Sequence, residues 1–238
     1  LQGGPGGSGP RPLSPSSDGW IEEAIKHFRV VLPDQRGTGR SSRVDTHVIE
    51  DMDGGGKAGA AFLKRFLADS IVRDFEHLRR TEFGGARWAT LGQSYGGFLT
   101  LTYLSLFPQG VIASFITGGI PHVPADATDV YRHTFPRMAA KTKQFYERYP
   151  IDVERAAAVA DILQSRKVAL PNGDPLTVER FQCLGSDFGM KPSFERVHWI
   201  LDQAFLDGDG SASTSAELSD EFLSSVMDAT SSRPLYWP

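Results

Sequence analysis

The chain has 238 residues, with 25 lysines and arginines against 29 aspartates and glutamates, and a formal net charge of -4. This balance gives no indication of nucleic-acid binding, because basic and acidic residues are interspersed as on a solvated face. No run of about 18 apolar residues is present, so we predict no transmembrane helix and no membrane partner. Cys183 is the only cysteine, which excludes an internal disulfide and fits a reducing compartment. We therefore expect a cytoplasmic protein.

Segments typical of strands and of helices alternate through the first half of the chain. The apolar patterns predict helices over residues 20–28 and 60–80, a polar and glycine-rich loop over 44–59, and strands over 29–32, 87–91 and 111–117. Alternation of this kind is typical of a mostly parallel sheet with helices packed against it.

After residue 124 the pattern changes, and no convincing strand follows. We predict helices over residues 130–149, 153–166, 177–184, 193–206 and 219–227, and a mobile Gly/Ser/Thr-rich loop over 208–217. The chain is therefore expected to contain two domains. Residues 1–122 are predicted to form a partial α/β core, and residues 123–238 a helical cap inserted between core strands.

Gly92-Gln93-Ser94-Tyr95-Gly96-Gly97 is the most informative motif, because it fits the Gly-x-Ser-x-Gly nucleophile elbow. A predicted strand leads into it and a helical pattern over 98–107 leads out, which is the context that the motif requires. Small residues at Gly92 and Gly96 permit the tight turn, which holds the serine in a strained conformation. We predict that Ser94 is a nucleophile at a helix N-terminus, where backbone N–H groups favour an oxyanion.

Two further glycine-rich segments precede the elbow. Leu1-Gln2-Gly3-Gly4-Pro5-Gly6-Gly7 is a candidate oxyanion loop, in which Gly3 and Gly4 would supply one N–H donor and Tyr95 the other. The second segment follows a β-branched run and reads Asp34-Gln35-Arg36-Gly37-Thr38-Gly39-Arg40-Ser41. Asp34 and Arg36 are expected to pair and brace this turn. A phosphate-binding loop is disfavoured because no Lys-Ser/Thr follows the last glycine.

The three segments together, in this order, resemble the prolyl aminopeptidase (proline iminopeptidase) family of α/β-hydrolase serine peptidases. Thr117-Gly118-Gly119-Ile120-Pro121 is similar to the family's exit from the strand after the elbow helix. The resemblance covers residues 1 to about 121 and is looser over the predicted cap. It implies an α/β-hydrolase core with an inserted helical cap, truncated at both ends in this sequence. It also implies a serine aminopeptidase that releases N-terminal proline through an acyl-enzyme, without metal or cofactor.

The catalytic partners of the serine are expected outside this sequence. In such hydrolases the triad follows the order Ser, Asp or Glu, His, which places the acid and the histidine beyond Pro238. None of the six histidines has the expected position, so none is assigned a catalytic role. The 238 residues alone are therefore expected to be inactive.

The resemblance also implies that cap carboxylates bind the amine of a peptide with a free N-terminal residue. Asp202 is the candidate, and Glu195, seven positions earlier on the same helix face, is the second. Exposed acids on an amphipathic helix are the simpler alternative for either residue. A tripeptidyl aminopeptidase, a carboxylesterase and a non-enzymatic binding module of the same fold remain alternative functions, and the oligomeric state stays open.

Overall fold

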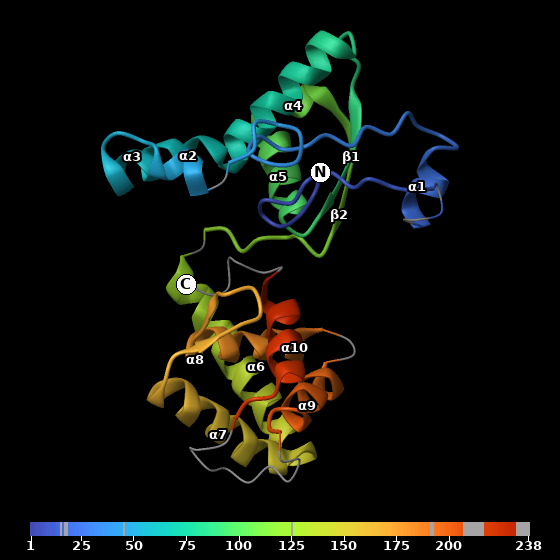
Figure 1. Ribbon diagram of the computed structural model, residues 1–238. Coiled ribbons are helices and arrows are strands. Elements are labelled where there is room, and N and C mark those ends of the chain that lie inside the picture. Colours follow the sequence, from blue (N-terminus) through green and yellow to red (C-terminus); the bar gives the residue numbers. More distant parts are fainter. Residues whose placement is uncertain are drawn as a thin grey trace. The chain divides into compact units, whose positions relative to one another are not determined.

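The computed structural model describes residues 1–14, 16, 19–44, 46–124, 126–190, 193–206 and 217–231. They form two compact units, which divide between residues 125 and 126 (Figure 1). Among the described helices, none combines the length and the apolar content that a bilayer-spanning helix needs.

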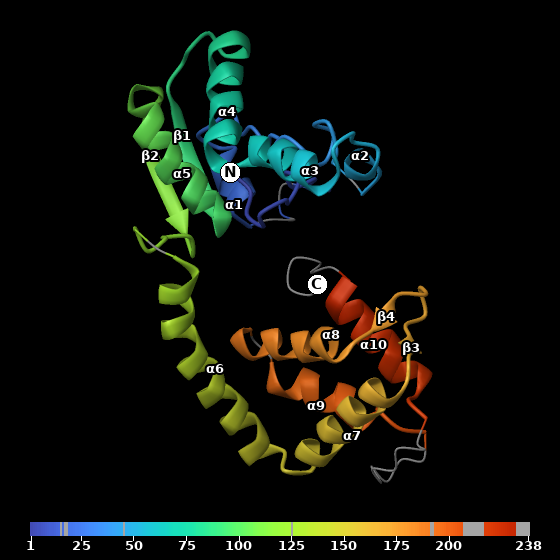
Figure 2. The same cartoon turned by 90° about the vertical axis from the view of Figure 1, so that its left-hand side faces the viewer.

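The first unit is built on two parallel strands and the helix that connects them. Its elements are α1 (Gly19–Ala24), α2 (Thr46–Glu50), α3 (Gly55–Leu63), η2 (Lys64–Phe66), α4 (Ala68–Glu82), β1 (Trp88–Gln93), α5 (Tyr95–Leu106), η3 (Pro108–Gly110) and β2 (Val111–Thr117). Strands β1 and β2 pair in parallel. Helix α5 packs on both strands and α4 packs on α5 (Figures 1 and 2). The predicted parallel sheet is confirmed, and β2 has the predicted bounds.

Apolar periodicity explains the α4–α5 contact. Val72 and Phe75 of α4 and Leu99 and Tyr103 of α5 are at most 3% exposed. Residues three or four apart lie on one face of a helix, so each helix presents an apolar stripe to the other. Helix α5 begins at Tyr95, three residues before the predicted start, because it follows directly on the elbow serine.

Two predictions between residues 44 and 80 are wrong. The predicted loop over 44–59 contains α2 and residues 55–59 of α3. The single helix predicted over 60–80 is interrupted by η2. Glycines there allow close helix packing, since a Cβ on Gly59 of α3 would lie 2.9 Å from Ile49 of α2. The break falls at Leu67, whose ψ of 168° is extended.

The strand predicted over residues 29–32 is also absent from the described part of the first unit. Its neighbour there is the glycine- and proline-rich start of the chain, since a Cβ on Gly9 would lie 3.1 Å from the Leu32 carbonyl oxygen. Proline has no N–H to donate, so a segment containing Pro5 and Pro10 is a poor partner for a strand. The predicted helix over 20–28 is present as α1, followed by turns.

The second unit is helical, as predicted. Its elements are α6 (Ala127–Arg148), α7 (Ile151–Ser165), β3 (Val168–Ala169), β4 (Pro175–Leu176), α8 (Val178–Gln182), η4 (Cys183–Gly189), α9 (Phe194–Asp202) and α10 (Asp220–Ser231). The antiparallel pair of β3 and β4 was missed, because two-residue strands leave no periodic signal. Except for Glu217, the loop predicted over 208–217 lies outside the described residues.

One apolar cluster holds the second unit together. Buried side chains from all five of its described α-helices contribute, among them Phe145, Val159, Ile162, Phe181, Leu201, Phe222 and Val226. Helix α6 is the least buried of these helices, since Phe145 is its only buried residue. Asp126 and Thr177 cap α6 and α8 by accepting hydrogen bonds from backbone N–H groups, which satisfies donors that a helix N-terminus leaves unpaired.

A buried charged network joins α4 to α5 in the first unit. Glu76 is 4% exposed and accepts hydrogen bonds from Arg79 at 2.8 Å, Arg80 at 2.6 Å and the Tyr103 hydroxyl at 2.6 Å. Arg79 also donates to the carbonyls of Gly85 and Ala86. The Arg79 guanidinium, above all, lowers the pKa of Glu76 from 4.5 to about 2.

Glu76→Gln should destabilise the protein by about 3 kcal/mol at neutral pH, because it leaves the buried Arg79 charge without its carboxylate. The pKa of Glu76 is depressed on folding, so its contribution is complete above pH 4.5 and is lost as pH falls toward 2. Urea unfolding should therefore show a difference that shrinks at about pH 3. The control is Glu82→Gln, on the exposed end of the same helix; equal losses from the two substitutions would contradict the prediction.

Candidate active site

Ser94 lies in the turn between β1 and α5. It has φ 54° and ψ -122°, which is a strained combination for a residue with a side chain. Its N–H donates to the Thr117 carbonyl at 3.0 Å, and its carbonyl accepts from the N–H of Gly97 at 2.9 Å. These bonds tie the strained residue to the end of β2 and to the first turn of α5, as a nucleophile elbow requires.

The start of the chain lies against this turn. The Leu1 nitrogen donates to the Leu91 carbonyl at 2.7 Å, so the residues before Gly3 run beside β1. A Cβ on Gly96 would lie 2.0 Å from the Leu1 carbonyl oxygen, and a Cβ on Gly3 would lie 2.9 Å from the Ser94 Cβ. The structure thus brings together Gly3 and Ser94, which are 91 positions apart in the sequence.

Two segments with backbone N–H groups lie next to Ser94, namely the first turn of α5 and the loop that contains Gly3. Tyr95 is the first residue of α5, and the N–H groups in the first turn of a helix have no acceptor within that helix. Gly3 and Gly4 approach from the other segment, and Gly4 has φ 129°, which glycine adopts without steric cost. The helix dipole adds a partial positive charge at this end of α5. The arrangement suits an oxygen atom that gains negative charge.

Gln35 holds the glycine-rich loop in place, a role that the sequence analysis missed. Its side chain is 1% exposed, and its Nε2 donates to the Gln2 carbonyl at 2.7 Å. A buried amide needs such a partner, since an unpaired one costs about 1–3 kcal/mol. The sequence offered one indication of this role, because Gln35 lies between the charged residues Asp34 and Arg36 of the same turn.

The predicted pairing of Asp34 with Arg36 is wrong. Asp34 instead accepts from the N–H groups of Gly9 and Arg40, both at 2.9 Å, and pairs with Arg11. The Arg40 N–H, followed by the Arg11 side chain, holds the pKa of Asp34 below its usual range. Arg36 donates to both oxygens of Asp74 on α4. Asp34 and Arg36 are two positions apart, yet their side chains bind different partners, which proximity in the sequence does not predict.

Both candidate amine-binding acids already pair with arginines inside the second unit. Asp202 Oδ1 accepts from Arg155 at 2.6 Å, and Glu195 Oε1 lies 2.5 Å from Arg148. The carboxylate side chains are nevertheless 40% and 41% exposed. Each pair therefore leaves part of its carboxylate accessible to another cation.

Arg155, the partner of Asp202, also binds a buried carboxylate. Asp152 is fully buried, and it accepts from Arg155 at 3.0 Å and is 2.8 Å from Nδ1 of His198. The His198 ring stacks on Tyr149 with centroids 3.9 Å apart. This arrangement fixes α7 against α9 and gives His198 a structural role within the second unit. Across the part of the chain that the structure describes, no three His, Cys, Asp or Glu side chains gather as a metal site requires.

Gly96→Ala should destabilise the protein by several kcal/mol, because the added methyl group would overlap main-chain atoms of Leu1 that cannot rotate away. The matched control is Gly56→Ala in α3, where a Cβ meets nothing within 4 Å. That control should stabilise the protein by up to about 1 kcal/mol, since alanine favours helix. Thermal unfolding of both variants checks the contrast, and equal melting temperatures would contradict the packing described here.

Comparison with known proteins identifies the fold family of the chain. The family model described as alpha/beta hydrolase fold matches residues 1–204. The chain is 43% identical over 206 residues to a proline iminopeptidase of Aeromonas sobria, covering 87% of this chain and 48% of that protein. It is 35% identical over 215 residues to the proline iminopeptidase aneH of Aspergillus aculeatus, covering 88% of this chain and 47% of that protein.

These matches confirm the resemblance drawn from the three glycine-rich segments, and they extend it past residue 121 into the second unit. The chain spans about half the length of the two curated relatives. The match to the family model, which covers most of the described residues, together with the strained serine between β1 and α5, shows that the chain belongs to the α/β-hydrolase fold family.

Proposed function

We propose that the full-length gene product is a serine aminopeptidase that releases N-terminal proline from peptides. The observation that carries this proposal is the placement of Gly3 against Ser94 at a strained elbow. The relatives supply the substrate class, since both are named proline iminopeptidases. The single cysteine supports a cytoplasmic location as part of the same proposal.

In the proposed mechanism, Ser94 Oγ attacks the carbonyl carbon of the N-terminal residue. The Tyr95 N–H and an N–H of the Gly3–Gly4 turn hold the oxyanion, and one such donor is typically worth about 3–4 kcal/mol. The C–N bond then breaks, the shortened peptide leaves with a proton on its new amine, and water hydrolyses the prolyl ester. We expect the base that moves these protons, and the carboxylate that orients it, C-terminal to Pro238 in the order Ser, acid, His.

A fluorophosphonate probe should label the full-length gene product at Ser94, and Ser94→Ala should abolish the labelling. The probe phosphonylates an activated serine with loss of fluoride, whereas Ser105 of α5, whose hydroxyl donates to the Leu101 carbonyl, should be inert. Peptide mass spectrometry after labelling locates the modified residue, and Ser105→Ala is the matched control. Labelling that survives Ser94→Ala would overturn the assignment, and no labelling of the unmodified protein would favour a binding module.

Recognition of the substrate amine is proposed for Asp202, with Glu195 as the second candidate. An N-terminal proline carries a positive charge, and such a charge is costly to desolvate without an anionic partner. Support comes from the exposed fraction of both carboxylates. Each already faces an arginine, so a substrate ammonium would share its carboxylate with that guanidinium.

Asp202→Asn should lower kcat/KM for proline arylamide about 10- to 100-fold, the range for one lost charge-assisted hydrogen bond. Hydrolysis of a simple acyl ester, which has no amine, should change little. Asp161→Asn, at an exposed position of α7, is the control in the same unit. If N-acetylprolyl arylamide were cleaved as well as the free amine, amine recognition would be wrong and a carboxylesterase would become the better assignment.

A further inference from the structure

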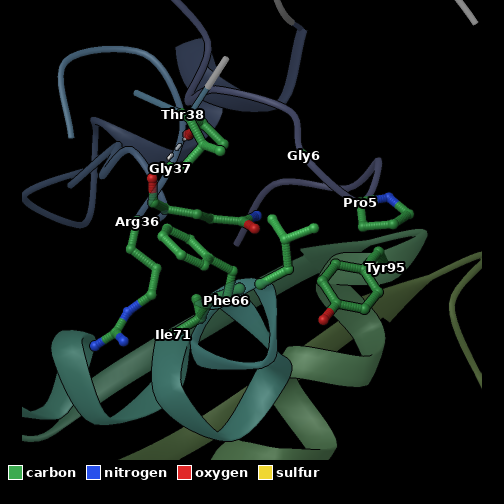
Figure 3. A pocket seen from close by; sticks show the side chains of 11 residues that line it. Pro5, Gly6, Arg36, Gly37, Thr38, Phe66, Ile71 and Tyr95 are labelled. Atoms are coloured by element: carbon green, nitrogen blue, oxygen red, sulfur yellow. Dashed lines mark hydrogen bonds between the residues drawn. The ribbon is translucent and has the colours of Figure 1, made fainter. Parts of the chain in front are cut away.

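The first unit contains a cavity whose lining includes Tyr95 and Pro5, the sequence neighbours of Ser94 and Gly4. The cavity is lined by Pro5, Gly6, Gln35, Arg36, Gly37, Thr38, Val44, Leu63, Phe66, Ile71 and Tyr95 (Figure 3). Two lining segments are continuous with the proposed machinery, since Tyr95 follows Ser94 and Pro5 follows the Gly3–Gly4 turn. A side chain next to the scissile bond of a bound peptide would therefore be close to this cavity.

The walls of the cavity are mainly apolar. Val44, Leu63, Phe66 and Ile71 supply aliphatic and aromatic surface, and the Tyr95 ring lies on the side of Pro5 (Figure 3). The Phe66 ring packs on Gly37, where a Cβ would lie 2.8 Å from it. Apolar surface of this kind gains free energy when it is covered by another apolar group.

The polar groups of the lining are bound elsewhere. Gln35 donates to the Gln2 carbonyl, and the Thr38 hydroxyl donates to the Gln35 carbonyl at 2.9 Å. Arg36 is bound to both oxygens of Asp74 and to the Arg65 carbonyl. In Figure 3 its side chain runs away from Tyr95 and Pro5. These groups leave no free charge directed at a ligand in the cavity.

No carboxylate belongs to the described lining of the cavity. The nearest acids face other groups: Asp74 binds Arg36, and the exposed Asp69 acts on both Arg36 and Tyr95 from outside the lining. Burial, followed by the charge of Asp69, raises the pKa of the Tyr95 hydroxyl, so this side chain is neutral at physiological pH. Among the described residues that line the cavity, Arg36 is the only charged one.

This lack of a carboxylate decides which part of a substrate fits. In an N-terminal proline the charged nitrogen is a member of the ring, so a pocket for the ring must also accommodate the ammonium. A neutral cavity beside an arginine would leave that ammonium without an anionic partner, which is costly. The cavity therefore suits the other side of the scissile bond, where the residue after the proline carries no charge on its nitrogen.

We infer that this cavity is the subsite for the side chain that follows the N-terminal residue, and that it selects an uncharged apolar side chain such as leucine. The inference rests on the proposed aminopeptidase function and adds a preference on the leaving side. Filling an apolar pocket with a leucine side chain instead of leaving it empty favours the larger substrate about tenfold or more.

The test compares prolyl-leucinamide, prolyl-glycinamide and prolyl-lysinamide as substrates of the full-length gene product. Amides are used so that no C-terminal carboxylate contributes. Prolyl-leucinamide should exceed prolyl-glycinamide about tenfold in kcat/KM. Leu63→Glu, at a lining position that is 46% exposed, should reduce this ratio to near one and should favour prolyl-lysinamide, because it adds the missing carboxylate.

The matched control is Leu67→Glu, which lies four residues further on, is 56% exposed and is not part of the lining. It should leave all three rates unchanged, and proline arylamide should confirm that both variants retain turnover. Turnover of proline arylamide with no preference for leucine, or the same preferences in Leu63→Glu and Leu67→Glu, would overturn the subsite alone. Failure of the unmodified protein to cleave any prolyl substrate would overturn the proposed function and the subsite together.

Discussion

Steric contact between main-chain segments around Ser94 is the constraint on which the candidate site depends. The carbonyl of Leu1 occupies the space where any side chain larger than hydrogen at Gly96 would begin. The same contact brings Gly3 against Ser94, so the nucleophile and the proposed oxyanion loop are placed by one packing arrangement. The strained φ of Ser94 persists because hydrogen bonds to β2 and α5 hold the residue on both sides.

Polar side chains around this packing are bound internally. Asp34 ties together residues 9, 11 and 40, Gln35 holds the oxyanion loop, and Arg36 reaches α4. Each of these side chains supports the backbone of the site, and none is left to attract a charged ligand into the adjoining cavity. In the second unit, Asp202 and Glu195 pair with arginines, yet both carboxylates stay partly exposed to solvent.

The sequence predicted the structure correctly where a short motif requires a particular local backbone geometry. The elbow and the strand over 111–117 followed from local pattern, because a nucleophile elbow needs a strand, a tight turn and a helix in immediate succession. Partners set by tertiary contact could not be predicted in this way. Asp34 pairs with Arg11, and Gly59 lies inside a helix interface; in both cases the deciding neighbour is more than five positions away in the chain. The glycines of residues 44–59 led to the prediction of a loop, whereas Gly59 permits close packing of α3 on α2.

The bonds that assemble the candidate site join residues distant in sequence, and this affects the order of folding. Leu1 and Leu91 are 90 positions apart, and Gln2 and Gln35 are 33 apart. Closing such loops costs chain entropy before any contact is gained, so non-local contacts of this kind form slowly. The α4–α5–β1–β2 core rests on closer neighbours and can form first. We therefore expect the oxyanion loop to take its place beside Ser94 after this core has formed.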